Sequence, residues 1–249
     1  MPTRILGVIP ARFASSRFPG KALATIAGRP MIQHVFERAS RSRYLHGLVI
    51  ATDDDRIAAA ARAFGAPVRM TRSDHPSGTD RVAEVASADT AELIVNIQGD
   101  EPLIDADALD SAILAMLGDA GYAMGTLVKR IENGSEVDNP NVVKAVVAND
   151  GRALYFSRYP IPYGRPDGDP PVRYKHIGLY IYRRELLLRY PDLPQGPLER
   201  AERLEQLRAL EHGYGIRAVE TDYESLGVDT PEDLERLSSI FEASLSLHG

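Results

Sequence analysis

Apolar positions gather in short runs along the first half of the chain. Four mostly apolar runs have the length and composition of buried strands, at residues 4–9, 47–52, 66–70 and 92–97. Each run is followed by a segment with helical periodicity, at residues 30–42, 54–65, 78–88 and 105–118. Strands joined through helices pair in parallel and carry helices on both faces. The pattern therefore predicts an α/β fold with a doubly wound, mostly parallel sheet.

The second half of the chain has a different pattern. From about Tyr122 the runs are β-rich, and a loop rich in Gly and Pro at residues 160–171 separates the last two of them; they read YAMGTLVKRI, NVVKAVVA, ALYFSR and VRYKHIGLYIYR. We expect an antiparallel-leaning extension of the same sheet. A helix is expected at 198–213, a strand at 215–221 and a last helix at 230–247. Because no linker divides the chain, we expect one domain over residues 1–249 with a β-rich portion at 122–190 within it.

Composition narrows the possible functions. The 249 residues are 44% hydrophobic and carry a formal net charge of −6, which argues against a nucleic acid as partner and requires any anion site to be local. The absence of cysteine excludes disulfides, thiolate zinc sites and a cysteine nucleophile. No segment approaches the ~20 apolar residues that a membrane-spanning helix needs. We therefore expect a cytoplasmic enzyme without membrane insertion.

Three cations crowd the loop that follows the first predicted strand. Arg12, Arg17 and Lys21 lie within ten residues, together with Ser15, Ser16, Pro19 and Gly20. Ligands of open α/β sheets bind at the carboxyl ends of strands, and arginine and lysine side chains suit phosphate oxygens. A solvated basic turn is the alternative, but it does not explain three cations in one short loop. The P-loop motif and the G-x-G-x-x-G motif are both absent. We interpret residues 12–21, hereafter the cationic loop, as a polyphosphate site.

Two aspartates have the chemistry to complete such a site. Asp100 follows an apolar strand in the stretch QGDEP, and Asp229 precedes a well-signalled helix in GVDTPEDL. A carboxylate beside phosphates is repelled unless a cation lies between them, and Mg²⁺ typically takes one or two carboxylates. Either aspartate alone also suits a loop or a helix start. The pair favours a Mg²⁺ site.

Seven motifs in order resemble one known family over nearly the whole chain. They are IPARFASSRFPGK, MTRSDHPSGTDR, VNIQGDEP, YFSRYPIPY, YKHIGLYIYR, LEQLR and GVDTPEDL. Together they resemble the CMP-KDO synthetases, that is, the 3-deoxy-manno-octulosonate (KDO) cytidylyltransferases among the nucleotide-sugar cytidylyltransferases. CMP-sialic acid synthetases share the start of the pattern but differ after IPAR. One departure is Ala22, where many relatives have proline; it leaves the cations intact.

The resemblance implies a reaction and an assembly. CTP and KDO would give CMP-KDO and diphosphate, with Mg²⁺ as cofactor, and the product would supply lipopolysaccharide synthesis. The implied fold is Rossmann-like, of the nucleotide-diphospho-sugar transferase type, with a β-rich dimerisation extension in a homodimer. Tyr155, Phe156 and Tyr182 suit either its interface or the core. Two alternatives stay open: a cytidylyltransferase for another acidic sugar (amino-KDO or sialic acid), and a non-catalytic nucleotide-binding regulator.

The resemblance also assigns residues. Catalysis would fall to Arg12, Lys21, Asp100 and Asp229, with the metal on the two aspartates. Nucleotide binding would involve Arg12, Arg17, Lys21, Arg72, Ser77 and Gln98. The sugar would contact Gln98, Arg158, Arg165, His176, Tyr180, Glu205 and Gln206. Some of these have plainer interpretations: Ser77 also suits a helix start, His176 a buried strand and Glu205 a solvated helix face.

Overall fold

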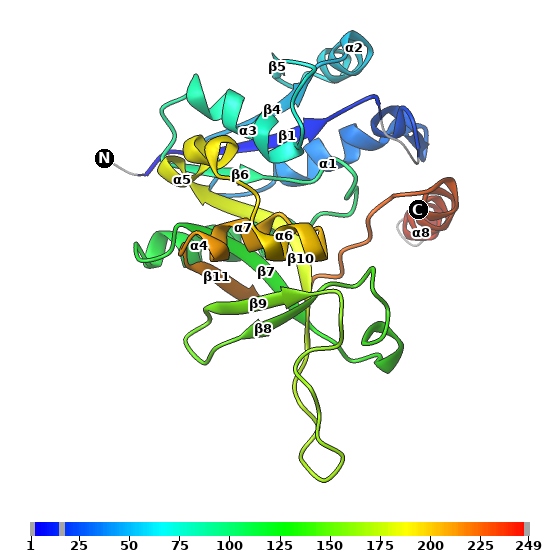
Figure 1. Ribbon diagram of the computed structural model, residues 1–249. Coiled ribbons are helices and arrows are strands. Elements are labelled where there is room, and N and C mark those ends of the chain that lie inside the picture. Colours follow the sequence, from blue (N-terminus) through cyan, green and yellow to red (C-terminus); the bar gives the residue numbers. More distant parts are fainter. Residues whose placement is uncertain (1–2, 15–17, 247–249) are drawn as a thin grey trace.

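A single mixed sheet forms the centre of the molecule (Figure 1). The computed structural model describes residues 3–14 and 18–246, and within them the sheet has nine strands, seven of which follow the order β11-β7-β10-β6-β1-β4-β5. Four neighbouring strands are parallel: β1 (Ile5–Ala11), β4 (Gly47–Thr52), β5 (Val68–Met70) and β6 (Leu93–Asn96). The predicted parallel sheet is confirmed.

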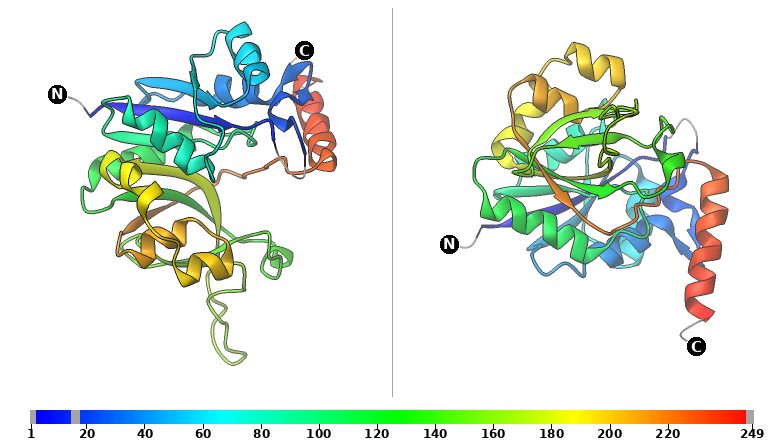
Figure 2. Two further views of the ribbon diagram at one scale, coloured as in Figure 1. Left: turned by 45° about the horizontal axis from the view of Figure 1, so that its top comes forward. Right: turned by 90° about the horizontal axis from the view of Figure 1, so that it is seen from below.

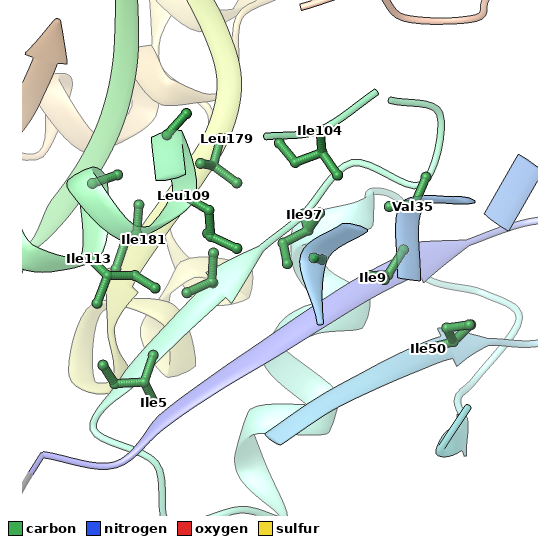
Figure 3. Close-up of a cluster of buried hydrophobic side chains, with 14 of the residues drawn as sticks. Ile5, Ile9, Val35, Ile50, Ile97, Ile104, Leu109, Ile113, Leu179 and Ile181 are labelled. Atoms are coloured by element: carbon green, nitrogen blue, oxygen red, sulfur yellow. The ribbon is translucent and has the colours of Figure 1, made fainter. Parts of the chain in front are cut away.

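Helices cover both faces of this sheet, as the alternating pattern predicts. One face packs against α1 (Met31–Ala39), α2 (Asp55–Ala63) and α4 (Ala106–Gly118). In Figure 3, Val35 of α1 and Leu109 of α4 lie near Ile9 of β1 and Ile97, the residue that follows β6. The other face packs against α3 (Gly78–Ser87) and α5 (Arg184–Arg189). The doubly wound architecture is confirmed.

The β-rich second half extends the same sheet in antiparallel fashion. The long strand β10 (Tyr174–Arg183) runs antiparallel to β6 on one side and to β7 (Met124–Arg130) on the other. Strands β8 (Lys144–Val147) and β9 (Ala153–Ser157) continue from β10, and β11 (Ile216–Glu220) pairs in parallel with β7. Phe156 and Tyr182 are fully buried, so these two belong to the core.

One predicted helix is wrong. The segment 198–213 forms two short helices, α6 (Pro197–Glu202) and α7 (Gln206–Glu211), separated where Arg203 adopts a left-handed conformation with φ 53°. The break folds α7 back onto α6, where the Glu211 carboxylate accepts hydrogen bonds from the first backbone N–H groups of α6 and the buried Arg208 pairs with Glu199 at 2.5 Å. These tertiary contacts outweigh the helical periodicity of the segment.

Several short elements lie outside the predicted pattern. They are η1 (Lys21–Leu23), β2 (Thr25–Ile26), β3 (Arg29–Pro30), η2 (Gly134–Glu136) and η3 (Tyr190–Asp192). The last helix, α8 (Pro231–Ser246), crosses back from β11 and packs beside β2 and the start of α1 (Figure 2). Its return brings the segment 221–230 past the carboxyl ends of the central strands. No helix in the described part of the chain has the length and apolar character to span a bilayer.

Candidate active site

Two adjoining cavities lie beyond the carboxyl ends of β1 and β6. The smaller, of about 120 Å³, is lined by Arg12, Lys21, Gly99 and Asp100 among others. The larger, of about 460 Å³, is lined by polar residues of the β-rich half and by Asp229. Gly78 and Gln98 line both cavities and therefore mark their junction. The site lies where an open α/β sheet is expected to bind ligands.

The Lys21 ammonium joins the two aspartates. Its Nζ lies 2.6 Å from Asp100 Oδ2 and 3.2 Å from Asp229 Oδ1, and it also donates to the carbonyl of Val228 at 2.9 Å. Asp100 and Asp229 lie 79 and 208 positions after Lys21 in the sequence. The expected convergence of the cationic loop with both aspartates is therefore present in the structure.

Backbone geometry brings these side chains together. Gly99 lies so close to β1 that a Cβ atom there would stand 2.8 Å from the carbonyl oxygen of Pro10, so only glycine fits. Gly20 has φ +73° and donates its N–H to the Phe13 carbonyl at 2.8 Å, which closes the cationic loop in front of Lys21. The Val228 N–H donates to the Asp100 carbonyl at 2.9 Å and fixes the segment that carries Asp229.

Glu101 also holds the segment 221–230, through Tyr223. Its buried carboxylate accepts a hydrogen bond from the Tyr223 hydroxyl at 3.1 Å. Burial, reinforced by the neighbouring charge of Asp100, raises the pKa of Glu101 to about 7. This contact links the QGDEP loop to residues 221–230, and it was not foreseen from the sequence.

Of the other two cations of the cationic loop, the structure describes only Arg12. Arg12 lines the smaller cavity, and its guanidinium donates to the Pro76 carbonyl at 3.5 Å, beside the start of α3. Arg17 lies outside the described residues. The departure at Ala22 sits in η1 with its side chain buried, and it leaves Lys21 directed at the aspartates.

Most residues expected to bind the sugar line the larger cavity. They are Gln98, Arg158, His176, Tyr180, Glu205 and Gln206. Arg158 is fixed by the carbonyls of Glu202 and Pro140, at 2.8 and 3.0 Å. The Glu205 carboxylate accepts a hydrogen bond from Thr79 at 2.7 Å, so this residue faces the cavity instead of lying on a solvated helix face. Helix α7 and strand β10 thus converge on one space.

His176 is held as a neutral ring. Burial lowers its pKa to about 3, and its Nε2 lies 3.0 Å from the Thr126 hydroxyl oxygen. That hydroxyl has one proton, which it donates to a carbonyl of β10, Leu179 O at 2.9 Å or Ile177 O at 3.1 Å. With that proton on either carbonyl, the hydroxyl accepts from His176 Nε2–H, and this tautomer has Nδ1 unprotonated. His176 can accept a hydrogen bond from a ligand through Nδ1.

Three expected contacts do not line either cavity. Arg72 is exposed and pairs with Asp74 at 2.6 Å. The Ser77 hydroxyl serves the capping box of α3, donating to Asp80 Oδ2 at 2.6 Å and accepting from the Asp80 N–H. Arg165 lies exposed in the loop 158–173, which extends away from the body of the molecule (Figure 1). The geometry gives Ser77 a structural task and does not bring Arg72 or Arg165 into the cavities.

Sequence reasoning missed several residues of the larger cavity. Thr79, Asn96 and Arg203 line it, and none of them stood out from the motifs alone. Asn96 carried a usable signal, because it is a polar residue in the last position of an otherwise apolar strand. Arg203 carried none, since its position follows from the unforeseen break between α6 and α7.

The two aspartates fit a divalent cation. Their carboxylates already share one cation, the Lys21 ammonium, which shows that both face a common point. Among residues 3–14 and 18–246, no group of three or more acidic or histidine side chains forms a complete set of protein ligands. Two carboxylates with the remaining positions left to water and substrate oxygens is the donor set of a nucleotide-bound Mg²⁺.

Comparisons with known proteins identify the family of the chain. The cytidylyltransferase family model matches residues 6–221. A 3-deoxy-manno-octulosonate cytidylyltransferase of Solibacter usitatus is 63% identical over 245 residues, covering 98% of this chain and 97% of that protein. The protein of that name from Geobacter sulfurreducens is 54% identical, covering 94% of this chain and 97% of that protein.

A solved structure supports the same assignment. CMP:2-keto-3-deoxy-manno-octonic acid synthetase in complex with CTP superposes with a TM-score of 0.93 at 43% identity, and the match covers 97% of this chain and 100% of that one. The resemblance carried by the seven motifs is thereby confirmed. The chain belongs to the cytidylyltransferase family, within the group of the 3-deoxy-manno-octulosonate cytidylyltransferases.

Proposed function

We propose that this protein transfers CMP from CTP to the anomeric hydroxyl of KDO, releasing diphosphate. The observation that carries the proposal is the bridge of Lys21 between Asp100 and Asp229. Asp100 lines the smaller cavity and Asp229 the larger, so the bridge stands where a phosphate chain and a sugar would meet. The triphosphate would lie against the cationic loop, and the sugar would occupy the larger cavity.

The chemistry needs no covalent enzyme intermediate. The anomeric oxygen attacks the α-phosphorus of CTP, the bond from that phosphorus to the β-phosphate bridging oxygen breaks, and diphosphate leaves with the electron pair. The hydroxyl proton passes to solvent. Catalysis in such a transfer comes mainly from positioning and charge neutralisation. Arg12 and Lys21 would hold the phosphates and stabilise the charge that develops on them.

We propose Mg²⁺ as the cofactor, held by Asp100 and Asp229. When bound, the ion would neutralise phosphate charge and favour ionisation of the sugar hydroxyl. Lys21 pairs with the same carboxylate oxygens at 2.6 and 3.2 Å. A metal on these oxygens would leave the Lys21 ammonium to the phosphates, so one residue can hold the aspartates together before binding and the triphosphate after it.

The larger cavity suits a sugar acid. Arg158 and Arg203 supply positive charge for one carboxylate. His176, Tyr180, Glu205 and Gln206 supply groups for several hydroxyls. These roles, and that of Gln98 at the junction of the cavities, are the assignments that we propose for this site.

Turnover measurements test the function directly. Diphosphate release would be followed with KDO and each of the four nucleoside triphosphates, with and without Mg²⁺. We expect release only with CTP, KDO and Mg²⁺ together. Activity with sialic acid or amino-KDO but not KDO would favour the alternative sugar. CTP binding without turnover on any sugar would favour the regulator.

The surroundings of the site support further proposals on assembly. We propose one domain over residues 1–249, in which 122–190 serve sugar binding and a homodimer interface. Tyr159 and Tyr163 are 77% and 79% exposed on the extended loop 158–173, which is unusual for large aromatic side chains. Replacing both with serine should shift the molar mass measured by light scattering from dimer to monomer. An unchanged mass would place the interface elsewhere or remove it.

The cellular setting follows from the proposed substrates. CTP is a cytoplasmic nucleotide, so we propose that the reaction takes place in the cytoplasm. Its product, an activated sugar acid, would supply lipopolysaccharide synthesis.

A further inference from the structure

Strand β10 loses its regular pairing where it passes the larger cavity. Between Ile177 and Tyr180 its register with β7 shifts, which leaves Gly178 and Leu179 outside the ladder; we call residues 177–180 the β10 bulge. At the same place β10 changes partners, because it pairs with β6 only from Tyr180 onward and with β8 only before the bulge. His176, Gly178 and Tyr180 line the larger cavity. The bulge therefore forms part of the cavity wall.

The hydroxyl of Thr126 lies against this bulge from the neighbouring strand β7. Thr126 is fully buried and lines neither cavity. Its Oγ1 lies 3.1 Å from the carbonyl oxygen of Ile177, 2.9 Å from that of Leu179 and 3.0 Å from His176 Nε2. A bulge interrupts the hydrogen bonds of the ladder, and the hydroxyl supplies a donor there. One side chain thus contacts both the backbone of the β10 bulge and a residue of the cavity.

The same hydroxyl distinguishes the two nitrogens of the His176 ring. The ring centroid lies 5.0 Å from that of Phe156 and 5.5 Å from that of Tyr180, and such ring contacts limit the orientation of the ring. They do not decide which nitrogen carries the hydrogen of the neutral ring. The Thr126 hydroxyl does, because its single proton is donated to a carbonyl of the β10 bulge and its oxygen accepts from Nε2–H.

The other ring nitrogen of His176 is left for a ligand. Within the described part of the chain no side chain or backbone group hydrogen-bonds to Nδ1, and Nδ1 is not among the fully buried polar atoms that lack a partner. It therefore keeps accessible surface on a residue that lines the larger cavity. An unprotonated Nδ1 only accepts hydrogen bonds, so it fits a sugar hydroxyl and repels a carboxylate, which has no proton to give.

We propose that Thr126 is a positioning residue: its hydroxyl holds the β10 bulge and fixes His176 in the tautomer whose Nδ1 accepts a hydroxyl of the sugar. The proposal rests on the function proposed above and adds a residue that does not touch the substrate. Valine has nearly the shape of threonine but neither donates to the bulge nor accepts from the imidazole. Thr126→Val therefore lets the ring hydrogen move to Nδ1, which presents a donor where the sugar needs an acceptor. Thr126→Ser keeps the hydroxyl.

Heteronuclear NMR of the histidine ring nitrogens tests the tautomer without any substrate. In the unaltered protein at neutral pH we expect His176 to have a protonated Nε2 and an unprotonated Nδ1, its signals being assigned by their loss in His176→Asn. Thr126→Val should lower the population of this tautomer, and Thr126→Ser should restore it. A protonated Nδ1 in the unaltered protein would overturn the proposal whether or not the variants fold. So would an unchanged His176 spectrum in folded Thr126→Val.

Steady-state kinetics test whether this geometry serves the sugar. Thr126→Val should raise KM for KDO by about tenfold or more and leave KM for CTP unchanged, whereas Thr126→Ser should recover most of the loss. Thr52→Val is the matched control, because Thr52 is also a fully buried strand threonine, its hydroxyl accepts the Asp54 N–H at 3.2 Å, and it lines neither cavity. An equal rise in both KM values, or equal losses in the valine and serine variants, would contradict the proposal.

A double-mutant cycle with His176→Asn tests whether Thr126 acts through His176. If it does, the double variant loses much less in kcat/KM for KDO than the product of the two single losses. Multiplicative losses would overturn that route. If the unaltered enzyme turns over no KDO with CTP, the proposed function fails, and the NMR result still decides whether Thr126 fixes the tautomer. If KDO is turned over and Thr126→Val behaves like the unaltered enzyme, only this inference fails.

Discussion

Lys21 Nζ lies 2.6 Å from Asp100 and 3.2 Å from Asp229, and it holds the two carboxylates at one point between two cavities. The lysine comes from the loop after β1, and the aspartates come from the loop after β6 and the segment before α8. The Lys21 side chain is 17% exposed, against 31% for Asp100 and 49% for Asp229, so the ammonium is shielded from solvent more than either carboxylate. The following predictions test what this arrangement does.

Asp100→Asn should abolish turnover. The amide keeps the size of the side chain but removes the negative charge that would hold a metal, so we expect kcat to fall by about 1,000-fold or more while CTP still binds weakly. Steady-state diphosphate release and calorimetry with CTP measure the two effects. Full activity in this variant would exclude the metal role of Asp100.

Lys21→Met should separate phosphate binding from the aspartates. The apolar side chain preserves the length but leaves no charge for the triphosphate, so we expect kcat to fall by about 100- to 1,000-fold. Because the ammonium no longer competes for the carboxylates, the Mg²⁺ concentration needed for half-maximal residual activity should not rise. Lys129→Met, in which the removed ammonium pairs with Glu224 away from the site, is the control. A rate close to that of the unaltered enzyme would show that Lys21 has no part in the transfer.

His176 should make the protein less stable in acid. Its folded-state pKa of about 3 lies below the ordinary 6.5, so between these values the unfolded chain binds a proton that the folded one does not. Stability therefore falls as pH drops through this window, by roughly 1.4 kcal/mol per unit at most. In urea titrations from pH 7 to 4.5, His176→Asn should show a shallower decline than the unaltered protein. Parallel declines would mean that His176 is not held neutral.

Removal of one partner of the buried Arg208–Glu199 pair should destabilise the protein strongly. Both side chains are buried, and Arg208 Nε also donates to Glu199 at 2.7 Å. Arg208→Met leaves Glu199 buried without its cation, so we expect the free energy of unfolding to fall by about 3–5 kcal/mol. Arg56→Met, which breaks an exposed pair with Asp54, should lower it by less than about 1 kcal/mol. Equal effects in chemical denaturation would contradict the distinction between buried and exposed pairs.

The pattern of apolar residues was sufficient to predict the central parallel strands. The strands around Val8, Ile50 and Val95 are mostly apolar because helices cover both of their faces, and that pattern is visible in the sequence. The break at Arg203 was not predictable, because it depends on contacts of Glu211 and Arg208 that exist only once α7 has folded back.

The candidate site likewise contains residues that the motifs identified and residues that they did not. Motifs identified Lys21, Asp100 and Asp229, because each has a charge with a clear task at the end of a strand or the start of a helix. Arg203 was not identified, because it reaches the larger cavity only through the break between α6 and α7. Ser77 shows the converse, since a residue assigned by motif has its hydroxyl engaged in a capping box.

Mn²⁺ binding in the presence of CTP, followed by electron paramagnetic resonance, tests the central claim most directly. The claim is that Asp100 and Asp229 hold one divalent cation on the triphosphate. We predict that Asp100→Asn and Asp229→Asn each weaken Mn²⁺ binding to the CTP complex by about tenfold or more, and that the double variant binds it no better than CTP does in free solution. Unchanged Mn²⁺ affinity in both single variants would contradict the account.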